Sequence, residues 1–257
     1  MTLTPLDIAR EIWKTNSPKQ VFSSEEQTRL ALEVSSRLLN FFQPGDFYVY
    51  VFNVSTADLE HVSPGMEKVL GHSPGGMTIA DLFNLIHPDD QPFFVNYEHE
   101  WGKFMRGLDT ERLFKYKVRM DLRMRKSDGS YKRILHQAMV FDVNEDGGIL
   151  RSFGVHTDID YLKIDGKPSM SIIGFDGEPS YTNVKTTEEL IPVKETLSKR
   201  EKEILQLITE GLLNKEIAAR LNISKETVDK HRKNMLEKTG CKTSTELVSK
   251  ALRNGWL

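Results

Sequence analysis

Basic side chains gather between residues 225 and 238, directly after the short polar stretch that begins at Asn222. Lysine and arginine neutralise the phosphates of nucleic acids and donate hydrogen bonds to guanine in the major groove. A solvated surface helix can also be rich in lysine, so these residue types alone leave both interpretations open. The cations of the segment are Lys225, Lys230, Arg232, Lys233 and Lys238.

Carboxylates that could form an acid–base pair or hold a metal ion occur in the N-terminal part of the chain. Most belong to turn sequences such as Ser-Asp-Gly, in which the side chain accepts a hydrogen bond from the backbone. The sequence contains no P-loop, Gly-x-Ser-x-Gly or His-Glu-x-x-His motif, and no kinase-like or receiver pattern. We therefore expect no enzyme, no catalytic residue and no metal. The carboxylates in question are Asp89, Asp90, Asp128, Asp158 and Asp160.

The length of 257 residues is sufficient for two domains, and 39% hydrophobic with 28% charged residues is typical of folded globular proteins. No apolar run approaches the ~20 residues that a bilayer span needs. The first residues lack the basic start and apolar centre of a secretory signal. The single cysteine, Cys241, excludes an internal disulfide and a multi-thiolate metal site within one chain. We expect a reduced, cytoplasmic protein.

Charge is divided unequally along the chain. Residues 194–257 carry 14 Lys and Arg against 9 Asp and Glu, whereas residues 1–193 carry the remaining 21 basic and 28 acidic residues. The net charge is thus +5 in the C-terminal part and −7 in the rest. Such a division favours a basic module that meets a polyanion, joined to an acidic module that does not.

The hydrophobic patterns of the N-terminal part predict an α+β domain around one antiparallel sheet. Aromatic and β-branched residues mark the strands, and short Gly- and Asp-containing turns join the last three of them. The predicted strands cover residues 47–52, 59–63, 113–126, 131–143 and 149–159. The predicted helices cover residues 5–13, 25–42, 66–70, 79–86 and 88–106.

The segment 164–193 differs from its surroundings. It is rich in Gly, Pro, Ser and Thr, and its one compact apolar patch runs from Met170 to Phe175. This composition predicts a linker that packs in part on a neighbouring domain.

Four short helices are predicted after residue 197, and a turn at residues 222–224 separates the second from the third. A short helix, a tight turn and a longer helix form a helix-turn-helix arrangement. On the third helix, Val228, Met235 and Leu236 share the face that packs on the bundle. The opposite face carries Glu226, Asp229, Lys230, Lys233 and Glu237. The predicted capping residues of the four helices are Ser198, Asn214, Ser224 and Thr243.

The segment from Leu197 to Gly240 resembles the LuxR-type helix-turn-helix of bacterial transcription regulators. The resemblance implies a four-helix DNA-binding domain whose third helix reads the major groove and whose fourth often dimerises. Asp229 stands where a basic residue is frequent in that family. The motifs that carry the resemblance are Leu197-Ser198-x-Arg200-Glu201, Gly211, Asn214-Lys215-Glu216-Ile217-Ala218, and Thr227-Val228 followed by His231.

This resemblance suggests roles for individual side chains. We expect Lys230 and Lys233 to contact base edges, and Asp229 is a candidate acceptor for a cytosine amino group. His231 lies nearer the packed flank of the helix and is expected to be structural. The expected phosphate contacts are Lys215, Lys225, Thr227, Arg232 and Lys238.

Residues 25–163 resemble a PAS sensory domain. The resemblance implies a five-stranded antiparallel sheet flanked by short helices, which senses a ligand, redox state or light, or dimerises. The segments that carry it are Tyr48 to Val54, Val62 to Gly71, Leu85 to Asp90, Arg125 to Tyr131 and Gly154 to Ile159.

The sequence predicts no cofactor for the PAS-like region, and leaves an unidentified small ligand open. Flavin photochemistry through a cysteine adduct is excluded, because Cys241 lies in the other module. Any of six histidines could ligate a haem iron, but no spacing singles one out, and we expect no haem. His87, before Pro88, is expected to act in local capping. The six are His61, His72, His87, His99, His136 and His156.

Together these patterns predict a bacterial cytoplasmic transcription regulator that binds double-stranded DNA as a homodimer and has no membrane partner. A signal at the PAS-like domain is expected to change how two DNA-binding heads are presented. Two alternatives remain: a sigma-factor-like module that acts on RNA polymerase, and an adaptor that binds only proteins. The predicted divisions are 1–24, an N-terminal helical extension; 25–163, the PAS-like domain; 164–193, the linker; and 194–257, the LuxR-type domain.

Overall fold

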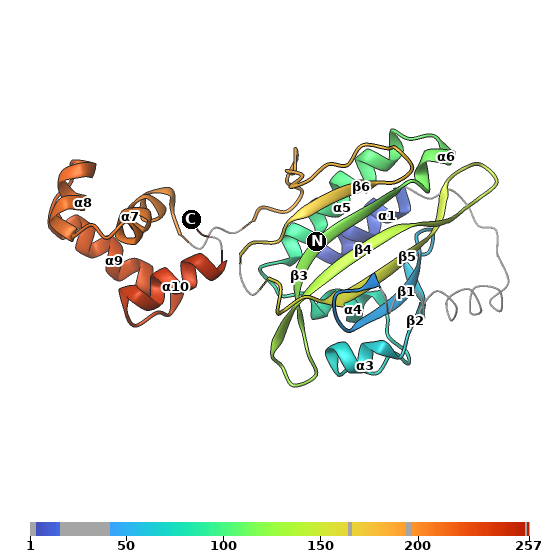
Figure 1. Cartoon of the computed structure of the whole chain (residues 1–257), viewed down its shortest axis with the longest axis horizontal. Helices are drawn as coiled ribbons and strands as arrows, with labels where there is room; N and C mark the ends of the chain where they lie inside the picture. Colours follow the sequence, from blue (N-terminus) through green and yellow to red (C-terminus); the bar gives the residue numbers. More distant parts are fainter. Residues whose placement is uncertain (1–3, 16–41, 164–165, 194–196, 255, 257) are drawn as a thin grey trace. The chain divides into compact units, whose positions relative to one another are not determined.

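The computed structural model describes residues 4–15, 42–163, 166–193, 197–254 and 256. These form two compact units (Figure 1), the first built from the sheet and its helices and the second from four C-terminal helices. The helix predicted over residues 25–42 lies almost entirely outside the described residues. Among the described residues, no helix is long and apolar enough to cross a bilayer.

The first unit is built on an antiparallel sheet with the strand order β2-β1-β5-β4-β3-β6. Its strands are dense in Tyr, Phe, Val, Ile and Met, which fit a pleated surface that packs on helices. The five strands predicted from the sequence are all present. The bounds of the six strands are β1 Phe47–Asn53, β2 Asp58–Val62, β3 Tyr116–Arg125, β4 Tyr131–Val143, β5 Ile149–Asp158 and β6 Met170–Gly174.

The sixth strand corrects the expected count of five. β6 comes from the apolar patch of the segment predicted as a linker, and it pairs with β3, where Val118 lies opposite Ile172. Without β6, the fully buried residues of β3 would stand on an open sheet edge with unpaired backbone groups. The edge is therefore covered by a segment far away in sequence.

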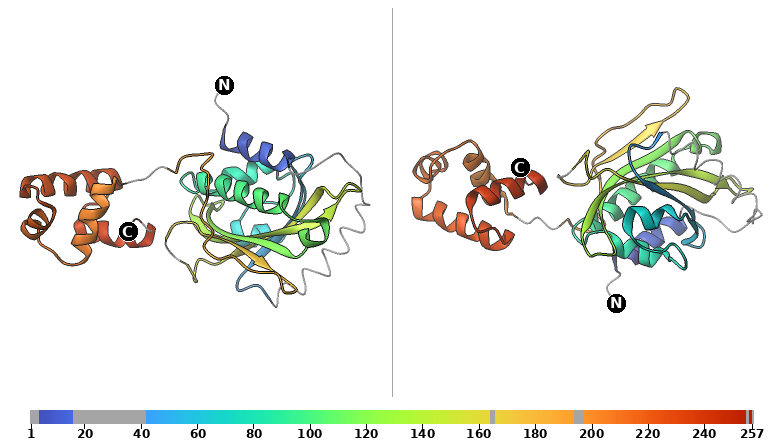
Figure 2. Two further views of the ribbon diagram at one scale, coloured as in Figure 1. Left: turned by 90° about the horizontal axis from the view of Figure 1, so that it is seen from above. Right: turned by 60° about the horizontal axis from the view of Figure 1, so that its bottom comes forward.

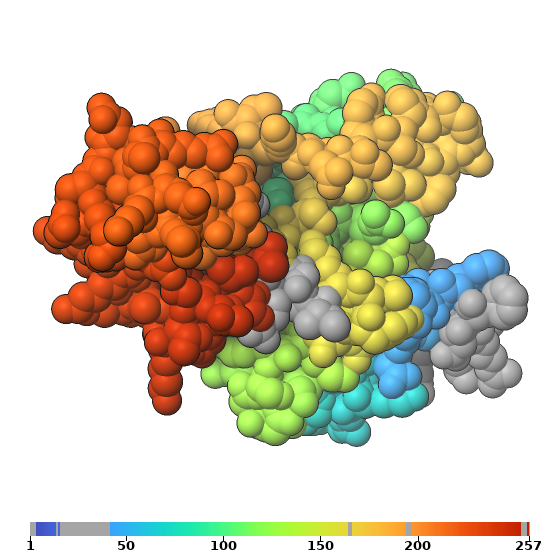
Figure 3. Space-filling view, turned by 60° about the vertical axis from the view of Figure 1, so that its left-hand side comes forward, coloured from blue at the N-terminus to red at the C-terminus, as the bar shows by residue number. Residues whose placement is uncertain are grey.

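The rest of that segment also packs on the first unit. Asn96 on α5 exchanges two hydrogen bonds with the backbone of Ile191, at 2.9 and 3.1 Å. Glu100, one turn further along α5, accepts from the backbone N–H of Thr187 at 2.7 Å. In the space-filling view, residues 168–193 (gold) lie against the green residues of the first unit (Figure 3). These residues are thus part of the folded unit.

Five described helices accompany the sheet (Figure 2), and buried side chains of α1, α3, α4 and α5 form one core with the strands. α1 contributes Ala9, Ile12 and Trp13, and the Trp13 ring meets the Phe52 ring edge-on at 4.7 Å between centroids. α5 begins at Gln91, three residues later than predicted; Asp90 occupies the N-cap position, but its carboxylate binds Arg123 and forms no capping hydrogen bond. The helix bounds are α1 Pro5–Thr15, α3 Gly65–Leu70, α4 Ile79–Leu85, α5 Gln91–Arg106 and α6 Thr110–Leu113.

The second unit is a four-helix domain, as predicted. Its core consists of apolar residues from all four helices, among them Ile204, Ile217, Met235 and Leu247. Ser198 and Glu201 form the predicted capping box at the start of α7. The bounds are α7 Lys199–Thr209, α8 Asn214–Leu221, α9 Lys225–Thr239 and α10 Ser244–Asn254.

Candidate nucleic-acid interface and ligand cavity

The turn between α8 and α9 fixes the start of α9. Asn222 adopts the left-handed conformation, φ 51°, which ends α8 and redirects the chain. The Ser224 hydroxyl then accepts a hydrogen bond from the Thr227 N–H at 3.1 Å and caps α9. Val228 and Met235 are fully buried, so the opposite face of α9 points to solvent. The sequence predicted this orientation.

Two of the expected phosphate contacts are engaged within the domain. Arg232, on α9, donates to the Asn214 side chain on α8 and to the Ser244 hydroxyl at the start of α10, the latter at 2.5 Å. Lys238 binds both carboxylate oxygens of Glu201 at 2.8 Å. Both cations therefore hold helices together in the free protein.

Asp229 is likewise bound by its neighbours. Its carboxylate accepts from the Asn214 side chain and lies 3.5 Å from the Lys225 ammonium, one turn away. Asn214 was expected to cap α8, but the N-cap residue is Leu213, and Glu216 accepts from the Leu213 N–H at 2.6 Å. The Asn214 side chain is consequently free to link α8 with α9.

Three other lysines face solvent. Lys233 is 77% exposed and lies 3.7 Å from Glu237 on the same helix, a pairing that water screens strongly. Lys215 and Lys230 are exposed, and neither has an ion-pair partner within the described part of the chain. His231 is half-buried. Lys215, Lys230 and Lys233 are thus accessible to a polyanion.

Three of the carboxylates weighed as an enzymatic group form hydrogen bonds or ion pairs within the first unit. Asp90 is fully buried, and it binds the Arg123 backbone and guanidinium. Asp128 accepts from the Ser130 N–H in the β3–β4 turn, and Lys132 binds Asp158. The described residues contain no group of three or more His, Cys, Asp or Glu side chains arranged to hold a metal ion.

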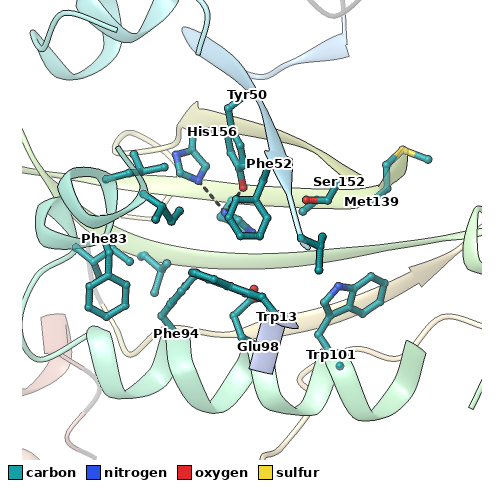
Figure 4. Close-up of a pocket in the computed structure, with 18 of the residues that line it drawn as sticks. Trp13, Tyr50, Phe52, Phe83, Phe94, Glu98, Trp101, Met139, Ser152 and His156 are labelled. Atoms are coloured by element: carbon teal, nitrogen blue, oxygen red, sulfur yellow. Dashed lines mark hydrogen bonds between the residues drawn. The ribbon is translucent and has the colours of Figure 1, made fainter. Parts of the chain in front are cut away.

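The first unit contains a cavity between the helix-covered face of its sheet and helices α1, α4 and α5. The space measures about 950 Å³ when its opening to solvent is included. Figure 4 shows Phe94, Glu98 and Trp101 extending from α5 towards Tyr50, Phe52 and His156 of the strands. Most of the side chains that line the cavity are apolar, and in such pockets the few polar groups orient a ligand.

A chain of hydrogen bonds crosses three strands at this cavity. The Tyr48 hydroxyl lies 2.5 Å from His156 Nδ1, and His156 Nε2 lies 2.7 Å from His136 Nδ1. The Tyr50 hydroxyl lies 3.3 Å from the same His136 nitrogen. Burial lowers the pKa of His136 to about 4 and that of His156 well below its usual value, so both rings are neutral at pH 7.

His87 plays the local role expected for it. Its Nδ1 accepts a hydrogen bond from the backbone N–H of Asp89 at 3.2 Å, at the start of α5. Burial, and secondarily Arg123, lowers its pKa, which keeps that nitrogen free to accept.

Gly154 is required for the position of Tyr50. A Cβ atom at residue 154 would lie 2.1 Å from the Tyr50 ring, because the ring passes over β5 at this point. We expect Gly154→Ala to destabilise the protein by ~1–3 kcal/mol through overpacking. Gly75→Ala is the control, since its Cβ would meet nothing closer than 3.7 Å. Thermal unfolding should show a lower Tm for Gly154→Ala alone, and equal Tm values would contradict this account.

The Glu98 carboxyl lines the cavity and is a weaker acid than usual. Burial raises its pKa to about 7, although the Trp13 indole N–H donates to its carboxylate at 2.8 Å. Because the folded state holds this proton more tightly than the unfolded chain, Glu98 stabilises the fold most below pH 4.5. This contribution, about 3 kcal/mol, is lost as the pH rises through 7.

Glu98→Gln isolates this contribution. His136 titrates in the opposite sense, since its lowered pKa costs stability as the pH falls from 6.5 towards 4. The informative quantity is therefore the difference in unfolding free energy between the wild type and Glu98→Gln, measured by urea unfolding from pH 4.5 to 8. We expect the wild type to lose stability relative to the variant over that range. Parallel curves would show that Glu98 has an ordinary pKa.

Comparison with known proteins identifies the second unit. Residues 195–251 match the family model described as bacterial regulatory proteins, luxR family. The response regulator Rre1 of Synechocystis sp. is 42% identical over 79 residues, 31% of this chain and 32% of that protein. The oxygen regulatory protein NreC of Staphylococcus aureus is 46% identical over 74 residues, 29% of this chain and 34% of that protein. The chain thus spans about a third of the length of these relatives.

Solved structures similar to this chain include a sensor domain and a LuxR-type receptor. The N-terminal domain of a diguanylate cyclase with PAS/PAC sensor from Marinobacter aquaeolei is 24% identical, with a TM-score of 0.37, over 45% of this chain and 96% of that one. VqmA of Vibrio cholerae is 15% identical, with a TM-score of 0.27, over 86% and 88% of the two chains.

The two units have different folds. The first is an α+β domain, with the five antiparallel strands predicted from the sequence and a sixth at the edge. The second is a LuxR-type helix-turn-helix domain, in which α8 and α9 form the helix-turn-helix.

Proposed function

We propose that the chain is a DNA-binding transcription regulator whose PAS-like domain senses a signal or partner and controls how the LuxR-type domain meets its operator. The observation that carries this proposal is the solvent-facing surface of α9. Its opposite face is buried, a hydroxyl caps its start, and Lys230 and Lys233 project from the exposed side. That is the geometry with which a recognition helix enters the major groove.

The contacts of the free protein refine the roles proposed for individual residues. Lys230 and Lys233 are proposed to contact base edges, and Lys215, Lys225 and Thr227 to contact phosphates. Asp229 reads cytosine only if DNA displaces its bonds to Asn214 and Lys225. Arg232 and Lys238 are proposed as positioning residues, because each is already bound to another helix.

We propose further that the regulator acts as a homodimer in the bacterial cytoplasm and has no enzymatic activity. Two recognition helices bind successive major grooves when they lie about one helical turn of DNA apart, and a two-fold dimer provides this spacing. The geometry of DNA therefore supports the dimer, with the PAS-like domain or α10 as its interface.

Selection of bound sequences from a random double-stranded DNA library tests this function. The full chain should enrich a site with two-fold symmetry, and light scattering on that site should give two chains per duplex. Recovery of no preferred sequence would contradict the proposal. Binding to RNA polymerase without any affinity for DNA alone would favour a sigma-factor-like role, and protein contacts alone an adaptor.

A further inference from the structure

We propose that the cavity of the PAS-like domain binds a small, uncharged, mostly apolar molecule that accepts a hydrogen bond from His136 Nε2 through a carbonyl oxygen or a ring nitrogen. This inference rests on the sensor role within the proposed function. It specifies the chemical class of the signal, and it names the side chain that selects it.

The first observation is an unpartnered polar atom. His136 lines the cavity and is only 5% exposed, yet its Nε2 is buried without a hydrogen-bond partner among the described residues. Buried polar atoms in folded proteins nearly always have a partner, since an unmade hydrogen bond costs stability. The other ring nitrogen, Nδ1, is engaged by His156. A bound molecule would supply the missing partner.

The hydrogen-bond chain determines whether His136 Nε2 is a donor or an acceptor. Burial raises the pKa of Tyr48 far above its usual value, so its hydroxyl keeps its proton, and His156 Nδ1 is the one partner that the described structure gives it. A buried hydroxyl with this one partner satisfies its proton only by donating it, so we assign Tyr48 as the donor to His156 Nδ1. The proton of His156 is then on Nε2, which donates to His136 Nδ1. A neutral imidazole carries one proton, so that of His136 is on Nε2. The cavity thus contains an N–H donor.

The side chains that line the cavity indicate the shape, polarity and charge of the ligand. Rings of Trp13, Phe52, Phe94 and Trp101 line the space, as Figure 4 shows, and favour a flat apolar body. The described lining contains no Lys or Arg, and it contains the acidic Glu98. An anionic ligand, or the two carboxylates of a haem, would therefore enter without a compensating cation. An uncharged molecule avoids this cost.

Equilibrium dialysis of the full chain at pH 7.5 against three probes of equal ring size tests the proposal. Quinoline has a ring-nitrogen acceptor, naphthalene is its hydrocarbon counterpart, and 2-naphthoate carries a negative charge. We expect quinoline to bind about tenfold more tightly than naphthalene, the effect of one hydrogen bond. We expect 2-naphthoate to bind more weakly than both. Equal binding of quinoline and naphthalene, tighter binding of 2-naphthoate, or binding of none of the three would overturn the proposal.

Two variants locate the binding. In His136→Phe, quinoline should lose its tenfold advantage while naphthalene binds as it does to the wild type; a retained advantage would refute the role of His136. Ala138→Phe keeps His136 and fills the cavity from β4, so it should abolish the binding of both probes. Unchanged binding to a folded Ala138→Phe would place the probes elsewhere. Circular dichroism and Tm confirm that each variant is folded, and Ala138→Phe provides a decisive result even where His136→Phe does not fold.

The two proposals fail in different experiments. Probe binding is measured without DNA, so its failure overturns the ligand class and leaves DNA binding untouched. Failure to select an operator would overturn the proposed function, whatever the cavity binds.

Discussion

Lys230→Ala is expected to weaken binding of the full chain to its selected DNA site by ~1–3 kcal/mol, a loss of roughly five- to 150-fold in affinity. Lys230 lies on the solvent-facing side of α9 and has no ion-pair partner within the described residues. Its ammonium is therefore available to donate to a base edge, and removing it breaks no contact that holds the fold. Gel-shift titration measures the change.

A series of altered half-sites distinguishes base contact from phosphate contact. If Lys230 reads a base, the loss is largest for the preferred base pair and small where that pair is already changed. An equal loss on every sequence would make Lys230 a phosphate contact. Lys68→Ala is the matched control, because it removes the same charge from a 71% exposed side chain of α3 in the other unit. Wild-type affinity of Lys230→Ala on all sites would contradict the proposed interface.

Arg232→Ala is expected to destabilise the C-terminal unit by ~2–4 kcal/mol, since it removes two hydrogen bonds from a charged donor. The Arg232 guanidinium joins three helices, through the Asn214 side chain on α8 and Ser244 at the start of α10. Arg232→Lys should restore little of the lost stability, because an ammonium lacks the planar fork that reaches two acceptors. Hydrogen-exchange mass spectrometry measures the amide exchange rates of peptides from α8–α10 separately from those of the sheet.

Comparison with Lys230→Ala separates a loss of stability from a loss of DNA affinity in Arg232→Ala. Lys230→Ala should lower DNA affinity and leave exchange in α8–α10 unchanged, whereas Arg232→Ala should accelerate exchange there. If Arg232→Ala instead exchanged like the wild type and lost DNA affinity, Arg232 would be a phosphate contact, the role predicted from the sequence.

The sequence predicted the elements whose signals are local. The alternating and aromatic strands, the Ser198 capping box and the cap at Ser224 all depend on residues a few positions apart. β6 could not be predicted in the same way, because its formation depends on the open edge of β3, some fifty residues earlier. The Met170–Phe175 patch was visible, but its partner was not.

The side-chain contacts divide in the same way, into those that local sequence patterns predict and those that depend on tertiary packing. The buried face of α9 follows from helical periodicity, whereas the bonds of Arg232, Lys238 and Asp229 depend on how separate helices pack. One pair of cavity residues could have been identified from the sequence. His136 and His156 lie at equal distances from Asp146 in the β4–β5 turn, and residues so placed are cross-strand neighbours in an antiparallel hairpin. That register singles out two of the six histidines.

The central claim is that α9 presents its cations to duplex DNA, and the salt dependence of DNA binding tests it most directly. Affinity of the full chain for a fluorescent duplex is measured by anisotropy from 50 to 300 mM salt. Each neutralised phosphate contributes about −0.9 to the slope of log affinity against log salt concentration, so contacts from two heads predict a linear decline steeper than about −2. Absence of binding at the lowest salt, or an affinity independent of salt, would contradict the claim.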